Sequence, residues 1–192
     1  MIARLHGQVV ARGKDSIIVD VGGIGYKVFV PADVLISTRT VEEITLHTHL
    51  QVREDNLSLF GFATEDAHDL FNLLLTVPGV GPKGALTLLS AMAPEAIRLA
   101  ISQEQPGILA RVPGVGKKTA EKIIVTLKDR IGAVSATEEL LALTAADAEV
   151  IDALTALGYS IVEAQRAVQN IPREISGVEE RLRRALSQFV ER

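Results

Sequence analysis

The chain carries the same glycine-rich turn twice, and this repeat constrains its fold more than any other feature of the sequence. The first copy reads VPGVGPKGA from Val77 and the second reads VPGVGKKTA from Val112. At an offset of 35 residues, eight of the twelve positions from Leu74 to Ala85 are identical in the second copy, which identifies an internal repeat. A short apolar helix is expected before each turn and a longer one after it. The sequence therefore predicts two copies of a helix, a tight hairpin and a helix.

The two glycines of each turn favour a role in binding phosphate. Glycine tolerates positive φ and has no Cβ, so backbone N–H groups stay open to a ligand that approaches closely. Those amides stand at the start of the following helix, whose dipole also favours an anion. The four valines of the turns are expected to point inward and hold them rigid; they are Val77, Val80, Val112 and Val115. Each copy therefore predicts a clamp for a phosphate group.

The sequence of the turns allows three other interpretations. Both turns could be ordinary connectors between helices, but basic residues follow both copies. The first copy spells the GxGxxG pattern of dinucleotide sites, but a helical segment precedes it and the second copy has Thr119 in place of the third glycine. The GK pair of the second copy suggests a P-loop, but Lys118 stands where Ser or Thr is required and Arg111 where the first glycine is required. We therefore expect no nucleotide site.

Charge is distributed unevenly along the chain, although its net charge is only −4. Residues 77–130 hold eight basic and four acidic side chains, a net charge of +4, whereas residues 133–192 hold six basic and ten acidic ones. A basic middle between acidic ends predicts one DNA-facing region beside parts that meet protein or solvent.

Cysteine usage and hydropathy bear on the compartment and on the chemistry. The chain has no cysteine, which excludes a disulfide framework, a thiolate nucleophile and a cysteine-ligated metal. No apolar run of about 18 residues occurs, and the opening MIARLHGQVV lacks the apolar segment of a signal peptide. The expected location is cytoplasmic.

The periodicity of the sequence divides the chain into parts. Residues 1–63 read as short strands separated by turn residues, a pattern typical of a small barrel such as an OB-fold. The expected strands are IARL, QVVA, SIIVDV, YKVFV, EITLHTHLQV and LSLFGF. Residues 64–132 become helical, with Thr64 as the first N-cap. Residues 133–144 are small and polar enough for a flexible linker, although 139–143 could form a short helix, and residues 145–192 read as three short helices.

The residues that could support catalysis or single-strand binding are few. Glycosylases with a similar hairpin place an aspartate downstream of it, where this chain has Ala136, and Asp129 is expected to be a surface charge. The histidines His6, His47, His49 and His68 lack the spacing of metal ligands, so we expect no metal and no cofactor. Aromatic residues make up only 4% of the chain, too few for a stacking platform. The rings of Tyr26, Phe29, Phe60 and Phe62 are expected in the barrel core.

The segment LQVREDNLSLFGF places Glu54 and Asp55 at the tip of a hairpin between the last two expected strands. Together with the other motifs, it closely resembles the RuvA family, the Holliday-junction binding subunit of bacterial branch migration. The resemblance covers the whole chain and rests on MIARLHG, VGGIGYKV, THLQVREDNLSLFGF, TVPGVGPKGAL, RVPGVGKKTAEKIIVTLKDR and ALTALGYSIVEAQRAV, in that order.

The resemblance implies an α+β multidomain fold with four parts. These are an OB-fold β-barrel with an acidic pin and tetramer contacts at 1–63, a tandem helix-hairpin-helix DNA-binding domain at 64–132, a flexible linker at 133–144, and a three-helix UBA-like bundle at 145–192 that binds the RuvB ATPase. It implies a non-catalytic subunit that binds four-way junctions without reading their sequence, holds them open and planar, and recruits RuvB for branch migration in recombination and repair. A repair enzyme and a structural DNA-binding adaptor are the rival functions.

The resemblance also assigns sites and partners. The hairpin contacts to DNA fall on Gly79, Val80, Gly81, Lys83, Gly114, Val115, Gly116, Lys117, Lys118 and Lys122. The acidic pin falls on Glu54 and Asp55, and the surface that binds RuvB is expected near Leu157, Gly158 and Tyr159. The implied partners are four-way junction DNA, RuvB, the RuvC resolvase in the same complex, and further copies of the chain in a homotetramer or an octamer, with no membrane.

Overall fold

The computed structural model describes residues 1–38, 43–131, 138–159, 163–164, 167–168, 170–172 and 175–190; the side chains of 138–145 and 190 are not described. Two compact units make up the chain, Met1–Ser90 and Ala91–Arg192. Among the described residues, no single helix is both long and apolar enough to cross a membrane, and only one pair of helices passes that test when counted together.

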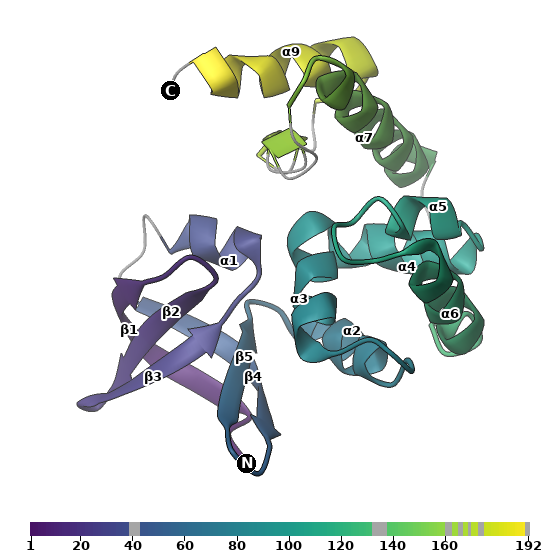
Figure 1. Ribbon diagram of the computed structural model, residues 1–192. Coiled ribbons are helices and arrows are strands. Elements are labelled where there is room, and N and C mark those ends of the chain that lie inside the picture. Colours follow the sequence, from purple (N-terminus) through teal and green to yellow (C-terminus); the bar gives the residue numbers. More distant parts are fainter. Residues whose placement is uncertain are drawn as a thin grey trace. The chain divides into compact units, whose positions relative to one another are not determined.

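The first unit begins with a closed barrel of five strands (Figure 1). The strands are β1 (Arg4–Arg12), β2 (Ser16–Val21), β3 (Ile24–Phe29), β4 (Glu43–Val52) and β5 (Leu57–Phe62). Their order around the barrel is β1-β2-β3-β5-β4, with β3 and β5 parallel and the other pairs antiparallel. The predicted OB-type barrel is therefore confirmed.

Alternation along the strands fills the barrel interior. Ile17 and Val19 of β2 and Val28 of β3 are buried in one cluster with Leu46 of β4. The short helix α1 (Ala32–Ser37) adds Val34 to the same cluster.

The separate strands IARL and QVVA are one continuous strand, so the predicted break at the HG pair is wrong. β1 runs through Gly7 and pairs with β4 there. A Cβ at Gly7 would lie 2.0 Å from the carbonyl oxygen of Asp20. Gly7 therefore permits the close approach of neighbouring backbone inside a strand, which is one reason for a glycine to occur there.

The placement of Phe60 and Phe62 in the barrel core is also wrong. Both rings are buried, but they face α2 (Glu65–Leu75) on the outside of the barrel, where Phe71 lies 5.4 Å and 4.8 Å from them, centroid to centroid. Alternation explains this result, because Leu59 takes the inward position on β5 and its neighbours must face outward. Tyr26 does pack against the barrel core.

Helix α2 begins as predicted and leads to α3 (Pro82–Ala91). The hydroxyl of Thr64 accepts a hydrogen bond from the N–H of Ala67 at 3.2 Å, and Glu65 and Asp66 lie in the first turn. Side-chain capping and acidic residues at this end both stabilise a helix.

The second unit is helical. It contains α4 (Pro94–Ser102), α5 (Pro106–Leu109), α6 (Lys117–Leu127), α7 (Glu138–Ala156) and α9 (Val178–Val190). The apolar stripe of α6 is buried at Ala120, Ile123, Ile124 and Leu127. Helix α7 begins within the predicted linker, and residues 133–137 of that linker lie outside the described residues.

The C-terminal helices share a core of their own. Val150 and Leu154 of α7 pack with Ala185 of α9 and with Ala164 and Val168. Ala164 and Val168 are helical and belong to the second of the three short helices predicted within 145–192, much of which lies outside the described residues. The layout of a barrel followed by helical regions confirms the predicted fold class.

An ion pair between the buried Arg181 and the partly exposed Asp147 joins α7 to α9. The Arg181 Nε donates to Asp147 Oδ1 at 2.7 Å, and its Nη1 donates to the carbonyl oxygen of Ile175 at 2.6 Å. Burial raises the pKa of the Asp147 carboxyl above its usual range, although Arg181 opposes the shift. The pair therefore orients two helices at the cost of desolvating Arg181 and part of Asp147.

Candidate nucleic-acid interface

The two glycine turns have matching backbone hydrogen bonds. The N–H of Val80 donates to the carbonyl oxygen of Val77 at 3.0 Å, and the N–H of Val115 donates to that of Val112 at 2.9 Å. All four valine side chains are buried, as predicted. Val80 and Val115 therefore hold the turns in shape, and their amides are already used inside the turn.

The two glycines within each turn serve different purposes. Gly79 and Gly114 have φ of +93° and +85°, which L residues with side chains rarely adopt. Gly116 instead has φ of −75° and ψ of 163°, and Gly81 is likewise outside the positive-φ group. A Cβ at Gly81 or Gly116 would meet no atom of the chain within 4 Å. The positive φ explains the first glycine of each turn, whereas among the described residues neither φ nor a close contact requires glycine at the second, apart from the N-cap preference at Gly116.

Backbone amides without an intrahelical acceptor lie where the two helices begin. The N–H of Ala85 donates to the carbonyl oxygen of Gly81 at 3.0 Å, and the N–H of Ala120 donates to that of Gly116 at 2.9 Å. The amides ahead of these bonds have no intrahelical acceptor. They belong to Lys83 and Gly84 in α3, and to Lys117, Lys118 and Thr119 in α6. Gly84 and Thr119 were not among the predicted contacts, although each lies in the first turn of its helix.

Basic side chains surround the second turn. Lys117, Lys118 and Lys122 of α6 are exposed, as is Lys83 beside the first turn. Arg111 precedes the second turn, but its Nη2 lies 3.2 Å from Oδ2 of Asp152 in α7. The cationic surface at the second turn therefore comes from α6.

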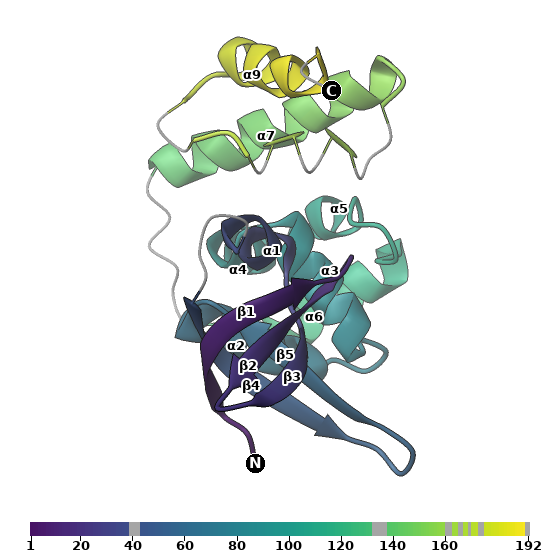
Figure 2. The same ribbon diagram turned by 90° about the vertical axis from the view of Figure 1, so that its left-hand side faces the viewer.

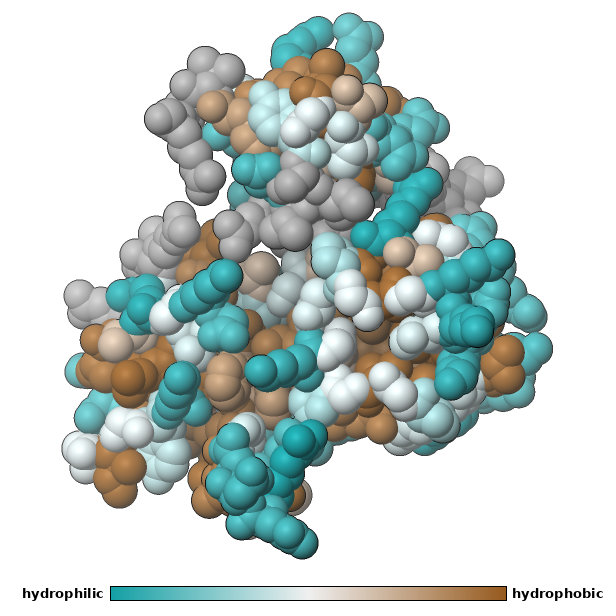
Figure 3. Space-filling model, in the orientation of Figure 1, coloured by the Kyte–Doolittle hydropathy of each residue, from teal (hydrophilic) through white to brown (hydrophobic). Residues whose placement is uncertain are grey.

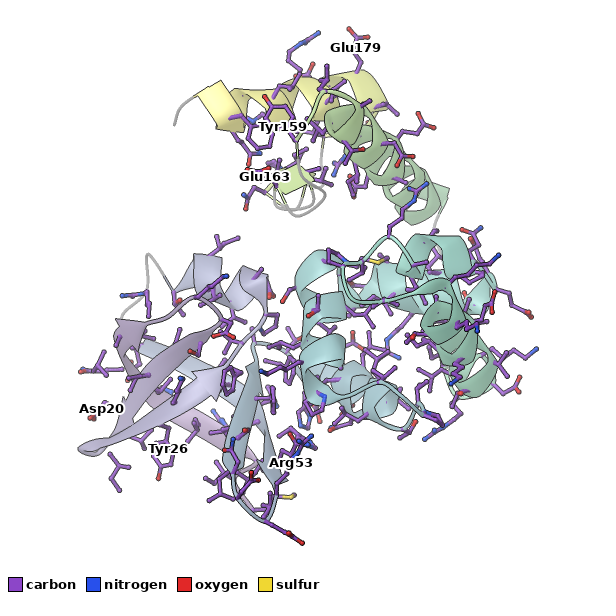
Figure 4. The ribbon with its side chains drawn as sticks, in the orientation of Figure 1. Asp20, Tyr26, Arg53, Tyr159, Glu163 and Glu179 are labelled. Carbon is purple, nitrogen blue, oxygen red and sulfur yellow. The ribbon has the colours of Figure 1, made fainter. Side chains whose placement is uncertain are left out.

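The predicted acidic pin is a tight turn at the end of the β4–β5 hairpin, which extends away from the barrel (Figure 2). The N–H of Arg53 donates to the carbonyl oxygen of Asn56 at 2.9 Å, so Glu54 and Asp55 form the tip. Both are exposed. Figure 4 labels Arg53 near this end of the hairpin. The first turn and the acidic pin belong to the first unit, and the second turn to the second unit.

The residues expected to bind a partner follow helix α7. Leu157 is 62% exposed. Gly158 has φ of +96°, as expected for a glycine that ends a helix. The ring of Tyr159 stacks on Phe189 of α9 with 4.1 Å between centroids. Tyr159 therefore contributes to the C-terminal core, and Leu157 is the apolar side chain left at its surface.

Three of the four histidines lie where the barrel meets α2. The Nδ1 of His49 lies 2.9 Å from Oδ1 of Asn72, whose amide nitrogen lies 3.3 Å from His68. His47 lies 6.5 Å from His68, centroid to centroid. Within the described part of the chain, no group of three or more His, Asp or Glu side chains could hold a metal ion. These contacts are structural ones between a strand and a helix.

A barrel followed by two matching glycine hairpins defines a class of protein. Residues 71–129 match the family described as "SAM-like Helix-hairpin-helix tandem", and the geometry of the two turns agrees with it. The protein is therefore a tandem helix-hairpin-helix protein with an N-terminal barrel.

The flanking parts identify the family. Residues 1–61 match "RuvA N terminal domain" and residues 145–189 match "RuvA, C-terminal domain". Relatives named "Holliday junction branch migration complex subunit RuvA" come from Herpetosiphon aurantiacus, 44% identical over 98% of both chains, and Symbiobacterium thermophilum, also 44% identical over 98% of both. A third, from Stutzerimonas stutzeri, is 41% identical over 99% of this chain and 100% of the relative. The chain belongs to the RuvA family.

Proposed function

We propose that this protein is the DNA-binding subunit of a branch-migration complex. It binds four-way junctions by their backbone, holds them open and planar, and recruits the RuvB ATPase, which supplies the energy for movement in recombination and repair. The names of its relatives support this role. The subunit itself is not catalytic.

The single observation that carries the proposal is the second glycine of each turn. Gly81 and Gly116 face open space and have no positive φ to require glycine. A phosphate that approaches the amides at the start of α3 and α6 does require that space, because a side chain there would hold it away. Lys83, Lys117 and Lys118 lie beside those amides. Contacts of this kind bind the backbone without reading bases.

The acidic pin gives the binding its preference for a junction. Glu54 and Asp55 lie at the exposed tip of a projecting hairpin. Their charges repel phosphate within roughly the 8 Å Debye length at physiological salt, so they act at the tip and not at the clamps. A duplex presents phosphates to every part of the protein, whereas the centre of an open junction leaves room for the pin.

The complete assembly follows from the symmetry of the substrate. A junction with four equivalent arms is matched by a homotetramer in which each copy clamps one arm, and a second tetramer would give an octamer that covers both faces. The pins of a tetramer would meet at the crossover. The exposed Leu157 in the turn of Leu157, Gly158 and Tyr159 supplies the surface that contacts RuvB, and RuvC resolvase acts on the same open junction.

Gel-shift titration of a synthetic junction and a duplex of equal length tests the proposal. The protein should prefer the junction, and its affinity for both should fall steeply with salt. Replacing Glu54 by Gln and Asp55 by Asn should raise duplex affinity and reduce the preference. The control Asp15→Asn with Glu65→Gln makes the same change in net charge at exposed sites elsewhere and should leave the preference unchanged. If the control and the pin variant behave alike, the pin has no role in selecting the junction.

The same samples separate the rival functions. A repair enzyme would cut strands or release bases from labelled junction DNA, and a structural adaptor would bind it without supporting movement. The branch-migration subunit should leave the DNA intact and promote strand exchange only after RuvB and ATP are added.

A further inference from the structure

The β4–β5 hairpin carries an exposed apolar pair directly beneath the acidic pin. Val52 ends β4 and Leu57 begins β5, and the two residues face each other across the last rung of the ladder. Their exposed fractions are 67% and 69%. In the space-filling view, hydrophilic side chains gather at this end of the first unit with hydrophobic ones beside them (Figure 3).

The apolar pair continues a face of the hairpin that belongs to the barrel core. Leu50 and Leu59 form the rung two residues closer to the barrel and both pack in the core cluster. The intervening rung of Gln51 and Ser58 faces the other side. The inward face of the hairpin therefore remains apolar beyond the point where the barrel covers it.

We propose that Val52 and Leu57 contact unpaired bases at the crossover of a four-way junction and hold the nearest base pair open. This inference rests on the proposed function, because the pin must reach the crossover. It adds to that function a contact with the bases themselves, in addition to repulsion of phosphates by the tip.

The chemistry beside the apolar pair favours an unpaired base as its occupant. Glu54 and Asp55 repel phosphate and acidic protein surfaces, but their oxygens can accept hydrogen bonds from base N–H groups, as carboxylates do from cytosine. The apolar pair offers contact to the flat face of the same base. Aliphatic side chains on other DNA-binding proteins act in this way when they insert at a base step and unstack it. A base has an apolar face that can contact the apolar pair and N–H groups that can donate to the carboxylates of the tip.

The geometry also suits a probe that enters a narrow space. The tip is closed by the bond from Arg53 N–H to the Asn56 carbonyl, and the two apolar side chains lie one residue behind it on either strand. A base that leaves its pair at the crossover would meet the acids first and the apolar pair next.

Fluorescence of 2-aminopurine placed in the crossover base pair of a synthetic junction tests the proposal. The base becomes brighter when it is unstacked, so binding of the full-length protein should raise the signal. The variant Val52→Thr with Leu57→Thr keeps residues suited to a strand and removes most of the apolar contact. We expect the ratio of open to closed pair to fall about fivefold, equivalent to about 1 kcal/mol, while junction affinity in a gel shift changes little because the clamps are intact.

Two further variants sharpen the test. Leu57→Met keeps an apolar side chain and should retain the wild-type signal. Gln51→Thr with Ser58→Thr changes the neighbouring rung on the other face of the hairpin and should also retain it.

Each contrary result has a separate meaning. An unchanged signal with the double threonine variant overturns the contact with bases and leaves junction binding standing. A change in native mass of that variant assigns the apolar pair to contact between copies of the chain and also overturns the proposal. A wild-type protein that does not bind the junction overturns the proposed function, and this inference with it.

Discussion

The two glycines of the second turn make a matched experiment, because one is required by the fold and the other is not. Gly114 has φ of +85°, so alanine there must adopt a left-handed conformation. That conformation costs a residue with a Cβ about 1–2 kcal/mol. Gly116 lies at the N-cap of α6 with φ of −75° and ψ of 163°, which alanine adopts freely. Its replacement should cost only about 0.5 kcal/mol for the weaker cap.

Gly114→Ala should therefore lose more stability than Gly116→Ala, but Gly116→Ala should weaken DNA binding without a matching loss of stability. A Cβ at Gly116 would project into space that is free of protein atoms within 4 Å, where the proposed phosphate approaches the first amides of α6. A hydrogen bond to a charged group contributes about 1.5–3 kcal/mol. Loss of one such bond should weaken junction binding by about tenfold or more. Gly114→Ala should weaken binding as well, but only together with a measurable loss of stability.

Chemical denaturation and fluorescence anisotropy with a labelled junction measure the two effects separately. Gly116→Ala should unfold close to wild type and bind about tenfold more weakly. If it binds as tightly as wild type, no phosphate approaches this corner and the clamp is wrong. If it loses as much stability as Gly114→Ala, the glycine serves the fold and its exposure carries no functional meaning.

The first turn repeats the experiment with fewer donors. Gly79 has positive φ and Gly81 does not, so the same division of effects is expected. Pro82 begins α3 and has no N–H, whereas Lys117 begins α6 with one. Gly81→Ala should therefore weaken binding less than Gly116→Ala does. The opposite order would show that the count of amides does not control the strength of a clamp.

Two other positions give predictions about stability. A Cβ at Gly61 would lie 2.6 Å from Cγ1 of Val28, so Gly61→Ala should lower the free energy of unfolding by about 1–3 kcal/mol in thermal unfolding. In the control Gly107→Ala, the added Cβ meets nothing within 4 Å, so this change should be neutral or slightly stabilising. Removing Asp147 alone leaves Arg181 buried without its partner and should cost more than replacing both by apolar residues. Because the folded-state pKa of Asp147 is raised, its ionisation opposes folding. The resulting loss of stability should be absent below pH 3.8 and should grow as pH rises through the folded-state pKa. Unfolding measured over a pH series, with Asp147→Asn as the reference, should show this loss.

The sequence predicts the turns well because their requirements are local. The identity of VPGVG in both copies predicted one geometry, and the two turns have matching hydrogen bonds and matching glycine φ values. In each turn one buried valine lies between two exposed glycines, and its N–H bonds to a carbonyl only three residues earlier. The same holds for Thr64, whose capping bond joins residues three positions apart.

Features set by distant contacts were harder to predict. The segment LSLFGF is apolar on both faces of β5 because one face lines the barrel and the other covers α2. The alternation alone does not show whether Phe60 and Phe62 pack in the barrel core or against α2. Gly7 likewise suggests a strand break until the carbonyl of Asp20 explains it. The apolar pair of Val52 and Leu57 was missed because its exposure depends on where the barrel ends.

The distribution of charge explains how a protein with a net charge of −4 can bind DNA. Charges separated by more than roughly 8 Å in physiological salt are largely screened from one another. A phosphate at the start of α6 therefore responds mainly to Lys117, Lys118 and the amides beside it, and little to the acids of the C-terminal helices. The acids at the tip of the β4–β5 hairpin act over the same short range. Screening would allow one chain to attract phosphate at the proposed clamps and to repel it at the proposed pin, and binding an open junction in the proposed way needs both.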